Sequence, residues 1–271
     1  MVEIENKYKI YEKKFGYINF VGAYSLWLKE CNRFINVWIQ TVFSPLITSL
    51  LFLLVLSLAI GNERASVLGF SFITFLAPGL ICMSGIIQQS FSHSASSIMI
   101  GKMQNTLVDI LYAPLSAGEI TIAITLAACT RSFIIVIVSV LVFSFVVDLT
   151  FYSFFHIILL TFLGSFMTGA LGIIAGLWSE KFDHMASVTN FVITPLSFLS
   201  GTFYTMDRLP DFLQNITKFN PFFYMIDGFR YGFLGVSDGS IKFGLYYLTI
   251  LSFLTWFVAY ILFKKGYKIK S

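Results

Sequence analysis

"FGLYYLTILSFLTWFVAYILF", residues 243–263, contains no charged side chain. A helix needs about 20 consecutive apolar residues to cross the hydrocarbon core of a bilayer, and this run supplies them. The rest of the chain has the same character, because hydrophobic residues make up 57% of its 271 residues and charged residues only 12%. Soluble domains carry about 25% charged residues. The composition therefore predicts a protein that folds within a membrane.

Five more runs with few or no charges precede residues 243–263. They predict helices at about 39–60, 67–88, 120–146, 154–178 and 186–203. The sequence thus predicts an all-α membrane protein with six transmembrane helices in one domain, residues 39–263. In the second helix, "FLAPGL" places Pro78 and Gly79 near the middle, where the missing proline N–H is expected to interrupt the hydrogen-bond ladder.

The positions of lysine and arginine predict that both termini are cytoplasmic. Six positive residues precede the first predicted span. Four lysines follow the last predicted span, in a basic tail at the C-terminal end of the chain, residues 264–271. Lys102 and Lys181 fall in loops on this same side, whereas the first outer loop has only Arg64. The net charge of +4 reflects this asymmetry, so a nucleic-acid partner is not needed to explain it.

The first 38 residues are expected to form a cytoplasmic N-terminus that ends in an amphipathic helix. In "YINFVGAYSLWLKECNRFINVW", residues 17–38, apolar and aromatic residues recur at helical spacing, and Lys29, Glu30 and Arg33 lie on the opposite face. This pattern is typical of a helix that lies in the membrane interface. The alternative is a lead-in helix packed on a cytoplasmic partner, and the two interpretations are compatible.

A second amphipathic helix is predicted within a cytoplasmic loop, residues 91–119. Its apolar positions repeat at helical spacing until Pro114 stops the pattern. Such a helix either lies on the headgroups or seats in a groove of a cytoplasmic partner and transmits the motion of that partner. The candidates for this coupling are Met103, Leu107, Asp109 and Leu111.

Candidate residues for a transport path come mainly from the fifth predicted span, which is rich in hydroxyl and amide groups. Polar groups at bilayer depth are tolerated against protein or a hydrated cavity. The candidates are Asn190, Thr194, Pro195, Ser197 and Ser200, together with Arg131 of the third span. The alternatives are hydroxyls that bond to their own backbone, and an arginine that bonds to carbonyls of a neighbouring helix.

The segment 207–242, on the outer side, contains two apolar pieces that are each shorter than a span. Asn220 and Pro221 separate them. Short apolar stretches beside a membrane are typical of re-entrant or interfacial helices, so a re-entrant helical cap is predicted between helices 5 and 6. Asp227 and Arg230 are three residues apart, which would allow them to pair on a helix.

Gly172 and Gly176 form a G-x-x-x-G pattern in the fourth predicted span. Small residues allow two helices to approach closely within a membrane. The pattern alone does not distinguish packing inside one subunit from a contact between subunits.

No catalytic residue, metal site or cofactor site is expected in this chain. The Gly101–Lys102 pair fails as a P-loop, because Ser96 stands where the first glycine belongs and Met103 where Ser or Thr belongs. A membrane-embedded lipid-modifying enzyme, the alternative of another class, would need clustered acid, base or metal groups, and the histidines and aspartates are scattered. An ion-coupled carrier would need carboxylates in the middle of its spans.

Five stretches carry more information than their apolar composition. They are "NVWIQTVFSPLITSLLFLLV", "FLAPGLICMS", "QNTLVDILYAPLS", "SEKFDHMASVTNFVITPLSFLSGTFYTMDRLP" and "NPFFYMIDGFRYG". Together they resemble the membrane subunits of ATP-binding-cassette exporters of the type-2 permease family. The similarity covers nearly the whole chain, and the last two stretches are the most specific.

The resemblance implies a homodimeric permease in the bacterial inner membrane, with six helices per subunit. Two copies of a separate ATPase would bind its cytoplasmic face and hold ATP and magnesium. The coupling helix of the family maps to about 104–112, the lead-in helix that also contacts the ATPase to about 17–36, and the cap to 207–242. Pro221, Asp227 and Arg230 lie in that cap.

The family exports drugs, lipid-linked glycans, capsular polysaccharide and lipo-oligosaccharides. The resemblance therefore implies export of an amphiphilic or hydrophobic substrate, drug-like or lipid-linked. Export of a polysaccharide or lipo-oligosaccharide is the alternative.

Overall fold

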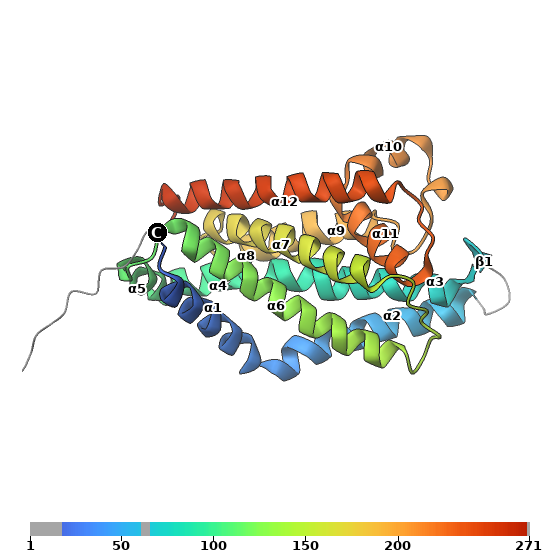
Figure 1. The fold of residues 1–271 in the computed structure, drawn as a ribbon, viewed down its shortest axis with the longest axis horizontal. Coiled ribbons are helices and arrows are strands. Elements are labelled where there is room, and N and C mark those ends of the chain that lie inside the picture. Colours follow the sequence, from blue (N-terminus) through green and yellow to red (C-terminus); the bar gives the residue numbers. More distant parts are fainter. Residues whose placement is uncertain (1–17, 61–65, 270–271) are drawn as a thin grey trace, which may run out of the picture.

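The computed structural model describes residues 18–60 and 66–269, and this part of the chain is built almost entirely of helices (Figure 1). The prediction of an all-α protein is confirmed. Residues 1–17, with the start of the expected N-terminal segment, and residues 270–271 of the basic tail lie outside the described residues. Two short strands, β1 (Ser66–Val67) and β2 (Phe70–Ser71), pair as an antiparallel hairpin.

Within the described ranges, five helical segments are long and apolar enough to cross a membrane. They run along the long axis of the molecule in Figure 1. They are Ile39–Ala59, Phe72–Met103, Ala117–Phe143, Phe154–Trp178 and Ile241–Lys264. The first combines the π-helical turn η1 (Ile39–Phe43) with α2 (Ser44–Ile60), and the last three are α6 (Ala117–Phe143), α7 (Phe154–Trp178) and α12 (Ile241–Lys264).

The fifth expected span corresponds to a shorter helical segment, residues 182–198. It consists of α8 (Phe182–Val188), the π-helical turn η3 (Thr189–Ile193) and α9 (Thr194–Phe198). The helix stops there because Leu199 leaves helical geometry and Gly201 takes a positive φ of 70°. The segment is therefore shorter than the predicted 186–203, and the count of six spans remains a prediction.

The second span is longer than expected. It comprises α3 (Phe72–Ile81), the π-helical turn η2 (Cys82–Gln88) and α4 (Gln89–Met103). Pro78 lies inside α3, and the π-helical turn begins four residues later, at Cys82. The prediction of a loop from residue 91 was wrong for 91–103, because these residues continue the helix, in which His93 and Ser94 are buried. Ser97 of the same stretch donates a hydrogen bond of 2.8 Å to Glu30 Oε2 of α1.

The glycines of α7 allow α4 to pack directly against it. A Cβ atom at Gly172 would lie 2.4 Å from the carbonyl oxygen of Phe91, and one at Gly176 would lie 2.9 Å from that of Ala95. Both distances are too short for real contacts, so the G-x-x-x-G pattern serves packing inside this chain. Of the two interpretations left open by the sequence, the structure confirms this one.

Three shorter helices complete the described fold, besides α1 (Phe20–Ile35) at the N-terminal end. They are α5 (Thr106–Tyr112), α10 (Asp211–Phe219) and α11 (Pro221–Leu234), with a 3-10 turn, η4 (Met206–Arg208), before α10. Figure 1 shows α1 and α5 at one end of the bundle and α10 near the opposite end, with α11 beside α3 and α9. The fold thus separates a candidate coupling region from a candidate cap.

Candidate coupling surface, transport path and cap

Helix α5 sits at the end of the bundle with its outer face uncovered. Met103, Asp109 and Leu111 are exposed, and Tyr112 is 86% exposed. Leu107 differs from the other coupling candidates, because it is only 2% exposed and its Cβ would lie 3.4 Å from a Cβ at Gly101. Leu107 therefore anchors α5 to α4, while the other three candidates face outward.

A groove of about 530 Å³ separates α5 from α1. Lys29 of α1 and Asp109 of α5 both line it, so it carries charges of both signs. Asn19 closes one end, because its Nδ2 donates to the carbonyl oxygen of Pro114 over 3.0 Å and its backbone N–H donates to the Glu119 carboxylate. These bonds join the start of α1 to the loop after α5 and to the start of α6.

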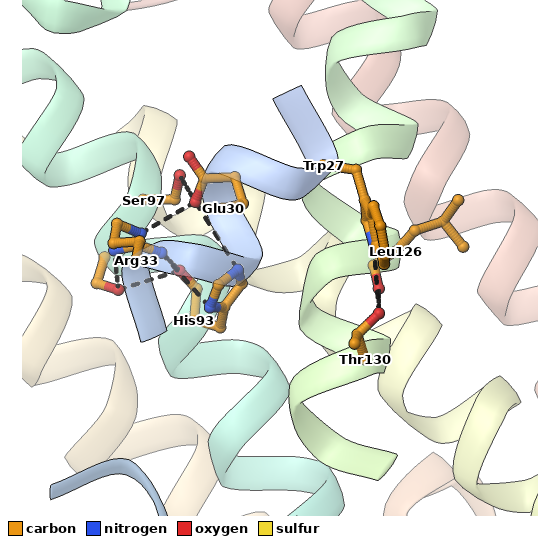
Figure 2. Close-up of polar contacts among 8 residues, drawn as sticks. Trp27, Glu30, Arg33, His93, Ser97, Leu126 and Thr130 are labelled. Carbon is orange, nitrogen blue, oxygen red and sulfur yellow. Dashed lines mark hydrogen bonds and ion pairs between the residues drawn. The ribbon is translucent and has the colours of Figure 1, made fainter. Parts of the chain in front are cut away.

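Two charged residues of α1, Glu30 and Arg33, are turned onto α4, whereas Lys29 is exposed (Figure 2). Glu30 is buried, and its Oε2 accepts from Ser97 Oγ over 2.8 Å and from Arg33 Nε over 3.0 Å. Arg33 Nη2 in turn donates to the carbonyl oxygen of His93 over 2.9 Å. The sequence placed Glu30 and Arg33 on the face opposite the apolar residues of α1, and in the structure these two side chains bond to hydroxyl and carbonyl groups of α4.

The outward side of α1 carries several apolar residues, beside exposed Lys29. Phe20, Val21, Tyr24 and Leu28 are exposed, whereas Trp27 reaches α6, where its Nε1 donates to Thr130 Oγ1 over 3.2 Å (Figure 2). A helix that is held by polar bonds on one side and exposes apolar side chains on the other is suited to a membrane interface or to a partner protein.

The structure divides the path candidates into two groups. Ser197 and Ser200 are buried, and their hydroxyls donate to the carbonyl oxygens of Ile193 and Leu196 in their own helix. Asn190 and Pro195 are exposed, and Thr194 is half-buried. The two serines follow the alternative of self-bonded hydroxyls, whereas the surface around Asn190 remains available to a path or a second subunit.

Arg131 lies apart from that surface, between α6 and α4. Its Nη2 donates to Oε1 of Gln89 at the start of α4. In the described part of the chain its Nε is buried without a hydrogen-bond partner. The bond to a side-chain amide differs from the expected bond to helix carbonyls.

The cap is centred on Arg230, which is only 1% exposed. Its Nη2 donates to the carbonyl oxygen of Gly201 over 2.7 Å, and its Nε donates to that of Phe75 over 3.2 Å. The guanidinium carbon also lies 3.7 Å from the centroid of the Phe75 ring. One side chain of α11 thus joins α3 and the end of the 182–198 segment.

Asp227 has other partners. Its two carboxylate oxygens accept the backbone N–H groups of Asp238 and Gly239, over 2.8 and 2.9 Å. Among the described residues, no ion pair within 4.0 Å joins Asp227 to Arg230, so the expected pair was wrong. Because α11 is buried, each group bonds to backbone on a different neighbouring segment instead.

The turn before α11 contains a residue that was not among the candidates. Asn220 Oδ1 accepts the N–H of Phe222 over 3.0 Å, one residue after Pro221 begins the helix. Its Nδ2 donates to the carbonyl oxygen of Leu196 over 2.8 Å and to Ser200 Oγ over 2.9 Å. The Asn-Pro pair could have indicated the helix cap, but not the contact with α9.

Comparison with known proteins identifies the family of this chain. The family model described as ABC-2 type transporter matches residues 23–234. The Inner membrane transport permease YadH of Escherichia coli K12 is 32% identical over 257 residues, which cover 94% of this chain and 99% of that protein. Nodulation protein J of Neorhizobium galegae is 24% identical over 92% of this chain and 94% of its own length, and that of Rhizobium meliloti is 25% identical over 78% and 80%. This chain therefore belongs to the ABC-2 type transporter family.

Proposed function

We propose that this chain is the membrane-spanning permease subunit of an exporter in the bacterial inner membrane, driven by a separate ATPase. Family membership and the name of the YadH relative support transport across that membrane. The five long apolar helices agree with a multi-pass protein. In this proposal both termini are cytoplasmic, the chain performs no covalent chemistry, and ATP and magnesium bind to the partner.

The observation that carries the proposal is the pairing of α1 and α5 at one end of the bundle. The groove of about 530 Å³ between them, together with exposed Met103, Leu111 and Tyr112, offers both a slot and protruding apolar side chains. Short helices of this kind seat well in grooves of partner proteins. Because Asn19 joins α1 to the start of α6, a movement of the partner against this surface would be transmitted directly to a long helix.

The remaining parts form the transport path and its outer cap. Two copies of the chain would meet across the surface around Asn190 and Pro195, where an exposed amide at bilayer depth needs a polar environment. Residues 182–198 would serve as the fifth of six spans. Helices α10 and α11 would enter the outer side of the membrane and return, held by Arg230 and Asn220.

The substrate in this proposal is amphiphilic or hydrophobic, drug-like or lipid-linked. Export of a polysaccharide or lipo-oligosaccharide is the second candidate. Exposed Phe191, and Phe198 stacked on Phe203 with Phe52 beside them, favour this second candidate because aromatic rings present flat faces to sugars.

Co-purification with the partner ATPase tests the coupling surface. Asp109→Arg reverses an exposed charge in the groove, and Asp148→Arg makes the same change at an exposed aspartate after the opposite end of α6. We expect Asp109→Arg to lose the ATPase and substrate-stimulated ATP hydrolysis, while Asp148→Arg keeps both. Equal ATPase binding by the two variants would exclude this surface as the docking site.

A further inference from the structure

A second groove, of about 520 Å³, runs along the side of the bundle between α7, α12 and the 182–198 segment. Its walls are almost wholly apolar and include Ile174, Trp178, Val192, Leu196, Phe222 and Tyr267. Val192 is 46% exposed and Trp178 is 45% exposed, so the groove opens to the surroundings of the bundle. It is separate from the coupling surface, and part of its lining, Leu196, Pro221 and Phe222, adjoins the contacts of Asn220.

The groove spans most of the depth of one leaflet of a bilayer. It follows α7 from Leu171 to Trp178 and the neighbouring segment from Val188 to Leu196. At about 1.5 Å per residue, these stretches are about 11–12 Å long. One leaflet contributes about 15 Å of hydrocarbon. A slot of this length and volume matches part of one extended acyl chain.

The end of the groove at Trp178 and Tyr267 carries positive charge. Lys268 Nζ lies 5.9 Å from the Trp178 ring centroid and 2.7 Å from Glu180 Oε1, and Lys265 is exposed two residues before Tyr267. The ammonium of Lys268 holds the pKa of the Glu180 carboxyl below its ordinary value. Tryptophan and tyrosine are typical of the membrane–water boundary, and basic residues beside such pockets attract anionic headgroups.

We propose that this groove binds one acyl chain of an anionic phospholipid of the surrounding bilayer, with the phosphate beside Lys265 and Lys268. The lipid stays bound as part of the folded permease and is not cargo. The apolar slot fits the acyl chain of the lipid. The lysines at the Trp178 end favour an anionic headgroup and place it at that end. This lipid would fill the space between α7, α12 and the 182–198 segment, and so support the helix that carries Asn190.

Photolabelling of the full chain in nanodiscs tests the proposal. The probe is phosphatidylglycerol with a diazirine on one acyl chain, compared with the same probe on phosphatidylcholine. We expect labelling of residues 171–178 and 188–196 to be several-fold stronger with phosphatidylglycerol. Val192→Trp should block the slot and lower that labelling, whereas Ile137→Trp, at a 57% exposed position of α6 outside the groove, should not.

The charge is tested separately. A Lys265→Glu, Lys268→Glu double variant should bring labelling by phosphatidylglycerol down to the level of phosphatidylcholine, while its circular dichroism stays that of the parent.

Labelling spread evenly over all exposed helices, or unchanged by Val192→Trp, would overturn the proposal. So would a disulfide between Val192→Cys residues of two copies, since a second subunit would then cover the groove. Release of the label on ATP hydrolysis in membranes that contain the partner ATPase would make the lipid cargo, and would also overturn it.

Discussion

The Nη2 atom of Arg230 lies 2.7 Å from the carbonyl oxygen of Gly201. Gly201 presents this carbonyl because its φ of 70° turns the backbone out of the helix that ends at Phe198. The same guanidinium bonds to Phe75 at the start of the second span. A single buried side chain therefore fixes the cap, the end of the 182–198 segment and α3 relative to one another.

Arg230→Met should destabilise the protein by about 3 kcal/mol, because two buried carbonyl groups lose their donor. Thermal unfolding of the purified protein in detergent measures this as a lower midpoint. Arg208→Met is the matched control, since Arg208 is exposed and the same atoms are removed. Equal midpoints for the two variants would contradict the role of Arg230.

Gly172→Ala should cost about 1–3 kcal/mol, because the new Cβ would overlap the carbonyl oxygen of Phe91 and push α7 away from α4. The yield of monodisperse protein and its unfolding midpoint report the effect. Gly118→Ala provides the control, since a Cβ there meets nothing closer than 3.7 Å. If both variants behave like the parent, the two helices are less closely packed than the structure indicates.

Glu30→Ala should loosen α1 from α4, because Ser97 and Arg33 lose their shared acceptor. Arg33 keeps its bond to the His93 carbonyl and is partly exposed, so we expect a cost of about 1–2 kcal/mol. Hydrogen exchange should become faster over residues 20–35 and remain unchanged in α7. Exposed Lys29→Ala should leave exchange in α1 as it is, and the same acceleration in both variants would argue against the network.

Asn220→Ala should weaken the contact between the outer cap and α9. The change removes the N-cap bond of α11 and, at the same time, the two hydrogen bonds that Asn220 donates. Loss of an N-cap alone costs about 1 kcal/mol. Faster hydrogen exchange over residues 211–234 is the expected result. Asn215→Ala, at an exposed position of α10, serves as the control, and unaltered exchange in Asn220→Ala would show that other contacts hold the cap.

The sequence predicted the helices that depend on local composition. The spans at α2, α6, α7 and α12 follow from their charge-poor runs, and α5 follows from its helical periodicity. The helix of residues 91–103 was missed because serine and histidine are typical of loops. Their hydrogen bonds to other helices, such as that of Ser97 to Glu30, become possible only between packed helices.

By itself, the sequence determined that the protein is a bundle of membrane-crossing helices, because lipid requires each spanning segment to satisfy its own backbone and to be apolar along its length. Only the tertiary structure decided which buried polar groups meet. Glu30 and Ser97 are 67 residues apart, and Arg230 and Gly201 are 29 apart. Such pairs leave no periodic pattern in the sequence, because they form only when whole helices pack against each other. For Asp227 and Arg230, the nearest partner in sequence was accordingly not the partner in space.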